Sequence, residues 1–470
     1  MTHRLNVPAD TINSAPFPWP SFFKWMVVFC VTGASVLFAQ YILPGAPAAP
    51  VILAAVCLAL WATGIVPEAW TALLFILVAS VLGLAAPIVV FSGFTSPTFW
   101  LFFAGLVLSA AMTHTGLGQS VSPLVGRFLG QSYRMAVAGC VLAGVLLAFV
   151  LPSAMVRLMI LLPVVGLLVE EAGYETGSNG RTGMLLGAAF GTFLPAFAIL
   201  PANTPNMILS GSAEAIYGLR VSYFNYLLLH FPVLGMLKAL CLIIVVPLLF
   251  PAPAPQKIKR AAPPRLSPAA KRLGFVLMVT LGLWLTDGIH GISPAWIGMA
   301  AALVCLVPHS GLVSPTCLKT DIGLGGLLFL AGFLGVGAII ADAGVGDALA
   351  EAAKALPDVT GKLQGIGLVA GFSAVIATLT NVATVPVIVT PLAETLAGFS
   401  GLGLSTVLMA QVIAFSTPLL PYQAPPLIVA KEIANLSLGV ITKLCLVMFA
   451  LTVLVLLPLD ILWWHILGRL

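Results

Sequence analysis

The sequence predicts an all-α polytopic membrane protein, with about eleven transmembrane helices plus two re-entrant hairpins, in inverted-topology repeats with two broken helices. Composition is the first reason. Of the 470 residues, 60% are hydrophobic and 7% are charged, whereas a soluble globular chain carries about 25% charged residues. Too little polar surface exists to cover a water-soluble particle. The other two reasons are the lengths of the apolar runs and the segments of the first half that recur in the second.

Spanning helices are expected wherever an apolar run is long enough to cross a bilayer, which takes about 20 residues. The runs cover residues 22–43, 49–66, 69–88, 97–114, 182–212, 225–250, 272–288, 293–312, 323–341, 401–433 and 437–464. Those at 182–212 and 401–433 contain paired prolines with amides, at 200–206 and 420–426. Proline removes a backbone donor and stops a helix, and unwound backbone at membrane depth survives only where it lines a cavity or is buried in protein. We expect broken helices at both places.

Two further apolar stretches, about 135–170 and about 364–399, have the pattern of re-entrant hairpins. In each, two apolar arms that are short for a full span flank a polar tip. Pro152 and Ser153 form the first tip, and Thr380 and Asn381 form the second. Two ordinary, closely spaced spans are the alternative interpretation at each place.

Internal repetition divides the chain. Five short segments recur in the same order with offsets of 220–228 residues, for example Leu60-Trp61 at Leu283-Trp284. An odd number of spans in each unit inverts the second copy, and inverted repeats with broken helices are typical of secondary transporters. The predicted divisions are a tail with the first helix (1–48), a first repeat (49–250), a linker (251–271) and a second repeat (272–470).

Basic residues set the predicted orientation, because cytoplasmic loops are enriched in Lys and Arg. The linker region carries Lys257, Lys259, Arg260, Arg265, Lys271 and Arg272 and no acid. It is therefore expected in the cytoplasm of a bacterial-type inner membrane, and with six spans before it the N-terminus is cytoplasmic as well. The net charge of +5 is thus a matter of orientation and does not point to nucleic acid. The seven cysteines are scattered singly, so no zinc or disulfide framework is predicted.

A charged side chain inside a membrane span costs about 2.5–3.5 kcal/mol on insertion scales and marks a functional site by default. Arg157 follows the first tip, and its planar fork of donors suits a carboxylate, phosphate or sulfate. The tips and breaks add neutral polar groups and no acidic residue. A site with a fixed cation and no acidic partner is expected to bind an anionic substrate. The candidate substrate-binding residues are Ser153, Arg157, Asn203, Thr204, Thr380, Asn381 and Gln423.

Structural roles are the alternative for these residues. Polar side chains in membrane bundles often hold helices together, and Arg157 could pair with carbonyl groups of the hairpin tip. Lys238, Lys431 and Lys443 also fall in predicted spans, and for them we expect snorkelling to an interface.

The chain resembles the divalent anion:sodium symporter family (solute carrier family 13), within the wider ion-transporter superfamily. The segments that carry the resemblance are 60–74 (LWATGIVPEAWTALL), 91–118, 151–165 (LPSAMVRLMILLPVV), 200–208 (LPANTPNMI), 380–391 (TNVATVPVIVTP) and 417–430. The resemblance implies transport of di- or tricarboxylates or sulfate by an elevator-like movement, usually in homodimers. It also implies that two Ser-Asn-Thr hairpin tips and two broken-helix loops bind substrate and sodium.

Both tips depart from that family pattern. The first reads Ser153-Ala154-Met155, and the second reads Thr380-Asn381-Val382. Arg157 resembles the arginine of the family's Ser-Asn-Thr-Ala-Arg variant, found among anion exchangers, where a fixed guanidinium could do the charge work of sodium. The resemblance leaves Na⁺ as a candidate coupling ion at the second tip, without any other cofactor. The residues that would bind it are Thr380, Asn381, Thr384, Thr417, Ala424 and Pro425.

Three other functions stay open at this point. An arsenite-type or sodium/proton antiporter belongs to the same superfamily, but the latter needs a titratable carboxylate in the core, and Glu68, Asp287 and Glu394 lie near segment ends. A membrane enzyme would need clustered acids for a metal, and the predicted spans contain no such cluster. We therefore expect no enzymatic activity. A transport-inactive receptor or scaffold is the third alternative.

Overall fold

The computed structural model describes residues 21–41, 47–118, 132–255, 266–345 and 361–470. Within these ranges every regular element is a helix, which confirms the all-α prediction. Seven of the described helices are long and apolar enough to cross a membrane, or eight when the bent pair at 393–415 is counted as one span. The N-terminal tail up to residue 20 and the central part of the predicted linker, residues 256–265, lie outside the described residues, and with them Lys257, Lys259, Arg260 and Arg265.

The helices of the first half follow the predicted order. Before the first hairpin come α1 (Ser21–Tyr41), α2 (Ala48–Thr63), α3 (Glu68–Val81), the short α4 (Pro87–Val90) and α5 (Ser92–Thr95), and α6 (Pro97–Thr115). The arms of the predicted hairpin are α8 (Tyr133–Val150) and α9 (Ala154–Glu171). α8 is itself long and apolar enough to cross a membrane, so the re-entrant course stays a prediction. The halves of the broken helix are α10 (Asn179–Phe193) and α11 (Thr204–Tyr217). The last span joins α12 (Tyr223–His230), the π-helical turn η5 (Phe231–Leu237) and α13 (Lys238–Leu249).

The second half repeats this order. It begins with α14 (Pro268–Leu285), the short α15 (Asp287–His290), α16 (Pro294–Leu306), the short α17 (Cys317–Thr320) and α18 (Leu324–Asp342). The arms of the second predicted hairpin are α20 (Lys362–Leu379), which is also long enough to cross a membrane, and the pair α21 (Thr384–Val389) and α22 (Ala393–Ser400). The broken helix consists of α23 (Leu404–Phe415) and α24 (Pro425–Ala434). The last span joins α25 (Leu438–Leu451), the π-helical turn η7 (Thr452–Leu456) and α26 (Leu457–Ile466).

Both predicted helix breaks are present. α10 ends at Phe193, and two 3₁₀ turns, Pro195–Ala198 and Leu200–Ala202, lead to the start of α11. α23 ends at Phe415, and the 3₁₀ turn Pro421–Gln423 precedes α24. The prolines stand where the α-helical hydrogen bonds stop, as their missing N–H groups require.

Features of the two halves recur at the predicted offset. The π-helical turns begin at Phe231 and Thr452. Trp61 and Trp284 are both buried, and their indole N–H groups donate to the carbonyl oxygens of Glu68 and Pro294, each at 3.0 Å. Equivalent tryptophans thus close equivalent helix connections, although a buried tryptophan could not be told from an interfacial one in the sequence.

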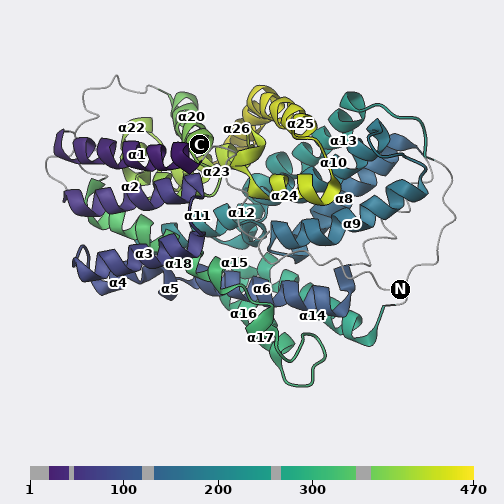
Figure 1. The fold of residues 1–470 in the computed structure, drawn as a ribbon, viewed down its shortest axis with the longest axis horizontal. Coiled ribbons are helices and arrows are strands. Elements are labelled where there is room, and N and C mark those ends of the chain that lie inside the picture. The colour runs from purple at the N-terminus through teal and green to yellow at the C-terminus, as the bar shows by residue number, and fades with distance from the viewer. Residues whose placement is uncertain (1–20, 42–46, 119–131, 256–265, 346–360) are drawn as a thin grey trace.

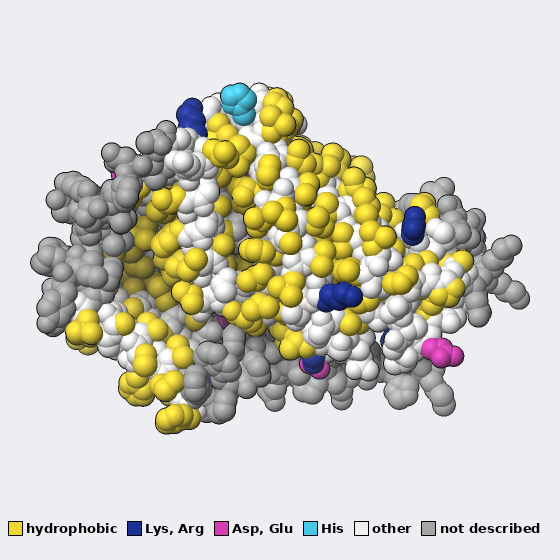
Figure 2. All heavy atoms as spheres, turned by 90° about the horizontal axis from the view of Figure 1, so that it is seen from above, with side chains coloured by type: hydrophobic (Ala, Val, Ile, Leu, Met, Phe, Trp, Pro, Cys, Tyr) yellow, Lys and Arg dark blue, Asp and Glu magenta, His cyan; other side chains and the backbone are white. Residues whose placement is uncertain are grey.

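Figure 1 shows α1 and α2 at one end of the molecule and α8, α9 and α10 at the other. α6 packs against α16, and α3 packs against α18, so helices of one half pair with helices of the other. Apolar side chains cover most of the face seen in Figure 2, with few charges among them. Among the strongly exposed apolar residues are Met278 at 76% and Ile289 at 87%. A surface of this kind suits lipid, in agreement with a multi-pass membrane protein.

Candidate functional site

The first hairpin tip is held from two sides. Ser153 caps α9, because its Oγ accepts a hydrogen bond from the Val156 N–H at 3.4 Å. Pro152 lies directly against α6, where a Cβ added to Gly105 would come within 2.4 Å of Pro152 Cγ. Only glycine allows α6 to pass this close to the tip. Ser153 itself is half-buried.

Arg157, one turn into α9, is fully buried. Its guanidinium donates to the carbonyl oxygen of Leu151 and, over 2.8 Å, to that of Ala202. It also donates to the carbonyl oxygen of Thr192 at 3.1 Å and to Asn203 Oδ1 at 3.0 Å. All four Nη hydrogens are therefore used to join the tip to the first break, and Nε–H has no partner in the described part of the chain. Direct contact between Arg157 and an anion stays a prediction.

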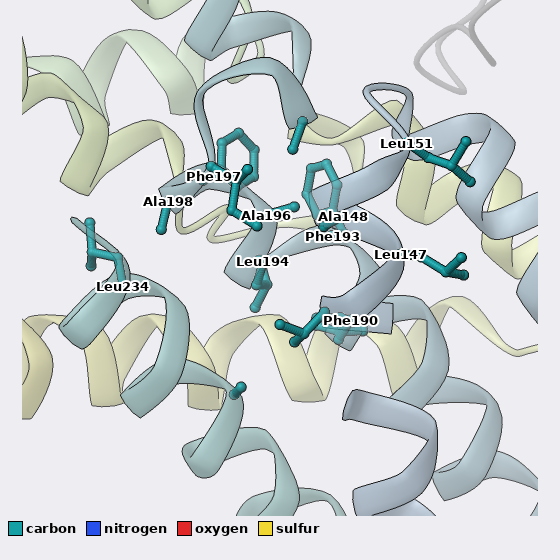
Figure 3. Close-up of a cluster of buried hydrophobic side chains, with 14 of the residues drawn as sticks. Leu147, Ala148, Leu151, Phe190, Phe193, Leu194, Ala196, Phe197, Ala198 and Leu234 are labelled. Atoms are coloured by element: carbon teal, nitrogen blue, oxygen red, sulfur yellow. The ribbon is translucent and has the colours of Figure 1, made fainter. Parts of the chain in front are cut away.

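The amides at the first break bind backbone carbonyls. Asn203 Nδ2 donates to the carbonyl oxygen of Phe193 at 3.3 Å, and Asn206 Nδ2 donates to that of Ile199 at 2.8 Å. Figure 3 shows the apolar side chains around this break, among them Phe193 and Phe197. Because these side chains exclude water, the unwound carbonyls depend on protein donors. Arg157 and the two asparagines supply these donors.

The second hairpin tip is organised by Asn381. Its Oδ1 accepts hydrogen bonds from the N–H groups of Ala383 (2.9 Å) and Thr384 (3.1 Å) and from Thr384 Oγ1 (3.2 Å). The side chain thus caps the start of α21, while Thr380 Oγ1 donates to the carbonyl oxygen of Ile376 at 2.6 Å. Asn381 is half-buried, and the described residues offer no partner for its Nδ2 donors.

The second tip is joined to the second break. The Val382 N–H donates to the carbonyl oxygen of Gln423 at 2.9 Å, and the Tyr422 hydroxyl donates to that of Thr378. Gln423 Oε1 accepts from the Leu420 N–H at 2.6 Å. The side chain of Gln423 is buried and stabilises the break, so a substrate contact from it stays a prediction. Tyr422 and Thr378 were missed in the sequence, where nothing distinguishes them from packing residues.

Thr417, a predicted sodium-binding residue, accepts a hydrogen bond from a buried lysine. The Lys238 ammonium donates to Thr417 Oγ1 at 2.8 Å, to Ser416 Oγ at 3.1 Å and to the Ser416 carbonyl oxygen at 3.2 Å. Lys238 is fully buried, so the prediction that it snorkels to an interface is wrong. It fails because the second break offers three oxygens deep in the protein. Lys443, in contrast, is exposed and lies 5.5 Å from the centre of the Phe250 ring.

One buried carboxyl was overlooked in the sequence. Asp460 in α26 is a fully buried carboxyl group that the local sequence pattern does not single out as it does Glu68, Asp287 and Glu394. It lies in electrostatic range of Lys238. A signal was available, because Asp460 follows Lys238 at an offset inside the range of the repeat, and each residue comes shortly after a π-helical turn.

The structure groups the candidates into two clusters. Ser153, Arg157, Asn203 and Thr204 belong to the first tip and break; Thr380, Asn381, Thr384, Thr417, Gln423, Ala424 and Pro425 belong to the second. Among the described residues no hydrogen bond joins one cluster to the other. Packing connects them, because α24 lies against α9 and α11 lies against α21.

A cavity of about 820 Å³ lies away from both clusters, between α4, α5, α11, α18 and α22. Glu214, Asp342 and Glu394 line it. Three carboxyl groups repel a dianion, so this cavity does not fit the predicted substrate.

Comparisons with known proteins agree with the fold. A membrane protein of Cupriavidus necator is 26% identical over 232 residues, which is 47% of this chain and 45% of that protein. The match therefore spans about half the length of this curated relative. The YdaH transporter of Alcanivorax borkumensis has the same fold, with a TM-score of 0.55 at 17% identity over 85% of this chain and 98% of the other. The sodium:sulfate symporter transmembrane region matches residues 24–470, and the chain belongs to this family.

Proposed function

We propose that the protein is a secondary active transporter that carries small divalent anions across the inner membrane. Dicarboxylates, tricarboxylates and sulfate are the candidate substrates. The observation that carries the proposal is the pair of hairpin tips, each bonded to a break in a broken helix, with hydroxyl and amide groups and no carboxylate in either cluster. Such a site suits an anion, as the family membership implies.

Four half-buried residues are the candidates for direct contact with the anion. They are Ser153, Thr204, Thr380 and Asn381. The Nδ2 group of Asn381 supplies donors, and Thr204 begins α11, where the helix dipole favours negative charge. Arg157 contributes positive charge from behind the first tip. For direct contact, one of its bonds to Ala202 or Asn203 would have to be exchanged for a bond to the substrate.

An elevator-like movement is part of the proposal. Each tip is bonded to the break of its own half, and each second half-helix packs against the hairpin of the other half. These contacts tie the hairpins and broken helices into one body. The paired helices α3 with α18 and α6 with α16 supply a frame for that body to move against. We propose inverted repeats and a homodimer as the context of this movement.

Uptake into proteoliposomes tests the function. Purified protein is reconstituted and offered labelled sulfate, succinate or citrate, with and without a sodium gradient and with and without the same anion inside. We expect saturable uptake of at least one dianion, driven by sodium or by exchange. Asn381→Ala should lose uptake, whereas Asn225→Ala, an exposed amide on α12, should retain it. If no dianion enters faster than into empty liposomes, the proposal is wrong.

Asp460 favours one second candidate, a sodium/proton antiporter-like member of the superfamily. That function needs a carboxylate in the core, and Asp460 is fully buried within the last span. The same proteoliposomes, loaded with a pH-sensitive dye, test it. Sodium-driven proton movement that Asp460→Asn abolishes would support this candidate over anion transport.

A further inference from the structure

Lys238 offers a positive charge to the second helix break. It is the first residue of α13, directly after the π-helical turn η5, and its side chain is completely buried. An ammonium group has three N–H donors. All three oxygens that accept from it belong to Ser416 and Thr417, at 2.8–3.2 Å. The donors of Lys238 are thus fully used at one place.

The acceptors form a set of neutral oxygens of the kind that binds a small hard cation. Both hydroxyl groups have the carbonyl oxygen of Ile413 as an acceptor, Ser416 Oγ at 3.0 Å and Thr417 Oγ1 at 3.3 Å. With their hydrogens directed to Ile413, their lone pairs are available to Lys238. The set also stands at the carbonyl end of α23, where the helix dipole attracts positive charge. Sodium would be drawn to the same oxygens.

Other predicted sodium ligands are engaged as well. Asn381 Oδ1 accepts three hydrogen bonds from Ala383 and Thr384, and the carbonyl oxygen of Ala424 accepts from the Leu427 N–H at 2.8 Å. The residues therefore do not fit sodium in this arrangement. A compact ammonium group is already bound to Thr417, one of the predicted sodium ligands.

Asp460 is a second buried titratable group close to Lys238. Its carboxyl oxygens, both ring nitrogens of His230 and the Trp464 indole nitrogen are buried without hydrogen-bond partners among the described residues. Lys238 lies in electrostatic range of the Asp460 carboxyl group, and Cys241 is the other group that acts on the lysine. No direct ion pair joins Lys238 to Asp460 in the described structure. The Lys238 ammonium donates to the second break instead.

We propose that Lys238 is a built-in cation that takes the place of sodium at Ser416 and Thr417, so that transport does not use a sodium gradient at this site. The inference rests on the proposed transport function. A cation that is tethered to α13 cannot be released on the other side of the membrane. It can hold the break, but it cannot convert a sodium gradient into work. Exchange of one anion for another is the mode of coupling that this arrangement favours.

Two measurements test the proposal, one of transport and one of stability. We expect uptake by the wild type to be unchanged when choline replaces sodium, and its apparent melting temperature to be the same in both salts at equal ionic strength. Lys238→Ala removes the cation and leaves the oxygens and Asp460 behind. Its melting temperature should fall, and sodium, but not choline, should restore it. Lys443→Ala, on the exposed face of α25, should behave as the wild type.

The opposite results overturn the proposal. If sodium raises uptake and melting temperature of the wild type saturably, and Lys238→Ala keeps that response, sodium binds beside the lysine. Should Lys238→Ala fail to fold, Lys238→Gln is the alternative, because glutamine keeps N–H donors and most of the side-chain volume without the charge. We expect Lys238→Gln to be less stable than the wild type and sodium to restore its stability. A Lys238→Gln variant as stable as the wild type would refute the role of the charge. If the wild type transports no dianion, the proposed function fails, while the stability measurements still decide the role of Lys238.

Discussion

Replacing Arg157 by methionine tests what the buried guanidinium does. Methionine keeps the length and the apolar part of the side chain, so little cavity is created. The change removes four hydrogen bonds, which join Leu151 at the tip to Thr192, Ala202 and Asn203 around the break. We therefore expect the first broken helix to lose its connection to the first hairpin.

The size of the effect follows from the number of bonds. Hydrogen bonds inside membrane proteins are worth about 0.6 kcal/mol each on average, and together these four are worth about 2.4 kcal/mol. Breaking a buried charged network costs about 3–5 kcal/mol in soluble proteins. We expect Arg157→Met to destabilise the protein by about 2–5 kcal/mol on these scales. Arg157→Lys keeps the charge but has three donors without the planar fork. Its stability should therefore lie between those of the wild type and Arg157→Met.

Thermal unfolding with a thiol-reactive dye measures this effect, because five of the seven cysteines, Cys140 in α8 among them, are buried and react only when the protein unfolds. Arg181→Met is the matched control. Arg181 pairs with Glu170 at 3.4 Å near the surface, where an ion pair is worth about 0–1 kcal/mol. If Arg157→Met unfolds like the wild type and still abolishes uptake, the guanidinium serves the substrate and not the break.

Three other changes have expected outcomes of their own. Gly191→Ala would place a Cβ 2.6 Å from Val141 Cα and should cost about 1–3 kcal/mol in thermal unfolding, whereas Gly166→Ala meets open space and should be neutral or stabilise by up to about 1 kcal/mol. Asp287→Ala removes the carboxylate that accepts a hydrogen bond from the Tyr223 N–H at 2.6 Å. It should destabilise the start of α12 by about 1–2 kcal/mol, which is measured as faster amide hydrogen exchange there. Asn381→Asp puts a negative charge at the second tip and should abolish dianion uptake, and unchanged uptake would remove Asn381 from the site.

The helices and the breaks could be predicted because each depends on local composition, whereas the number of spans stays a prediction. Length and hydropathy locate a helix that must cross lipid, and prolines with amides locate the positions where it stops. The partners of Arg157 could not be predicted in this way. They come from residues 151, 192, 202 and 203, and the sequence alone does not tell whether the fork faces a substrate or these carbonyls.

Lys238 and Asp460 show a second limit of the sequence. The repeat was detected from similar residues at a common offset, and these two have opposite charge. Taken alone, Lys238 has the pattern of an interfacial residue, and nothing in the sequence around Asp460 distinguishes it. Only the fold brings Lys238 to the second break and Asp460 within electrostatic range of it. An intramembrane charge should therefore be compared with the position one repeat away before it is assigned to an interface.

The two buried cations act at equivalent places. Arg157 binds the carbonyl oxygen of Thr192 in the last turn of α10, and Lys238 binds that of Ser416 directly after α23. Both carbonyl groups lie at the C-terminal ends of half-helices, where unpaired C=O groups and the helix dipole attract a positive charge. Both cations come from the first half of the chain, and both remain bound to the protein. If the proposal for Lys238 holds, breaks neutralised in this way need no sodium to hold them, and exchange of one anion for another is the expected mode of coupling.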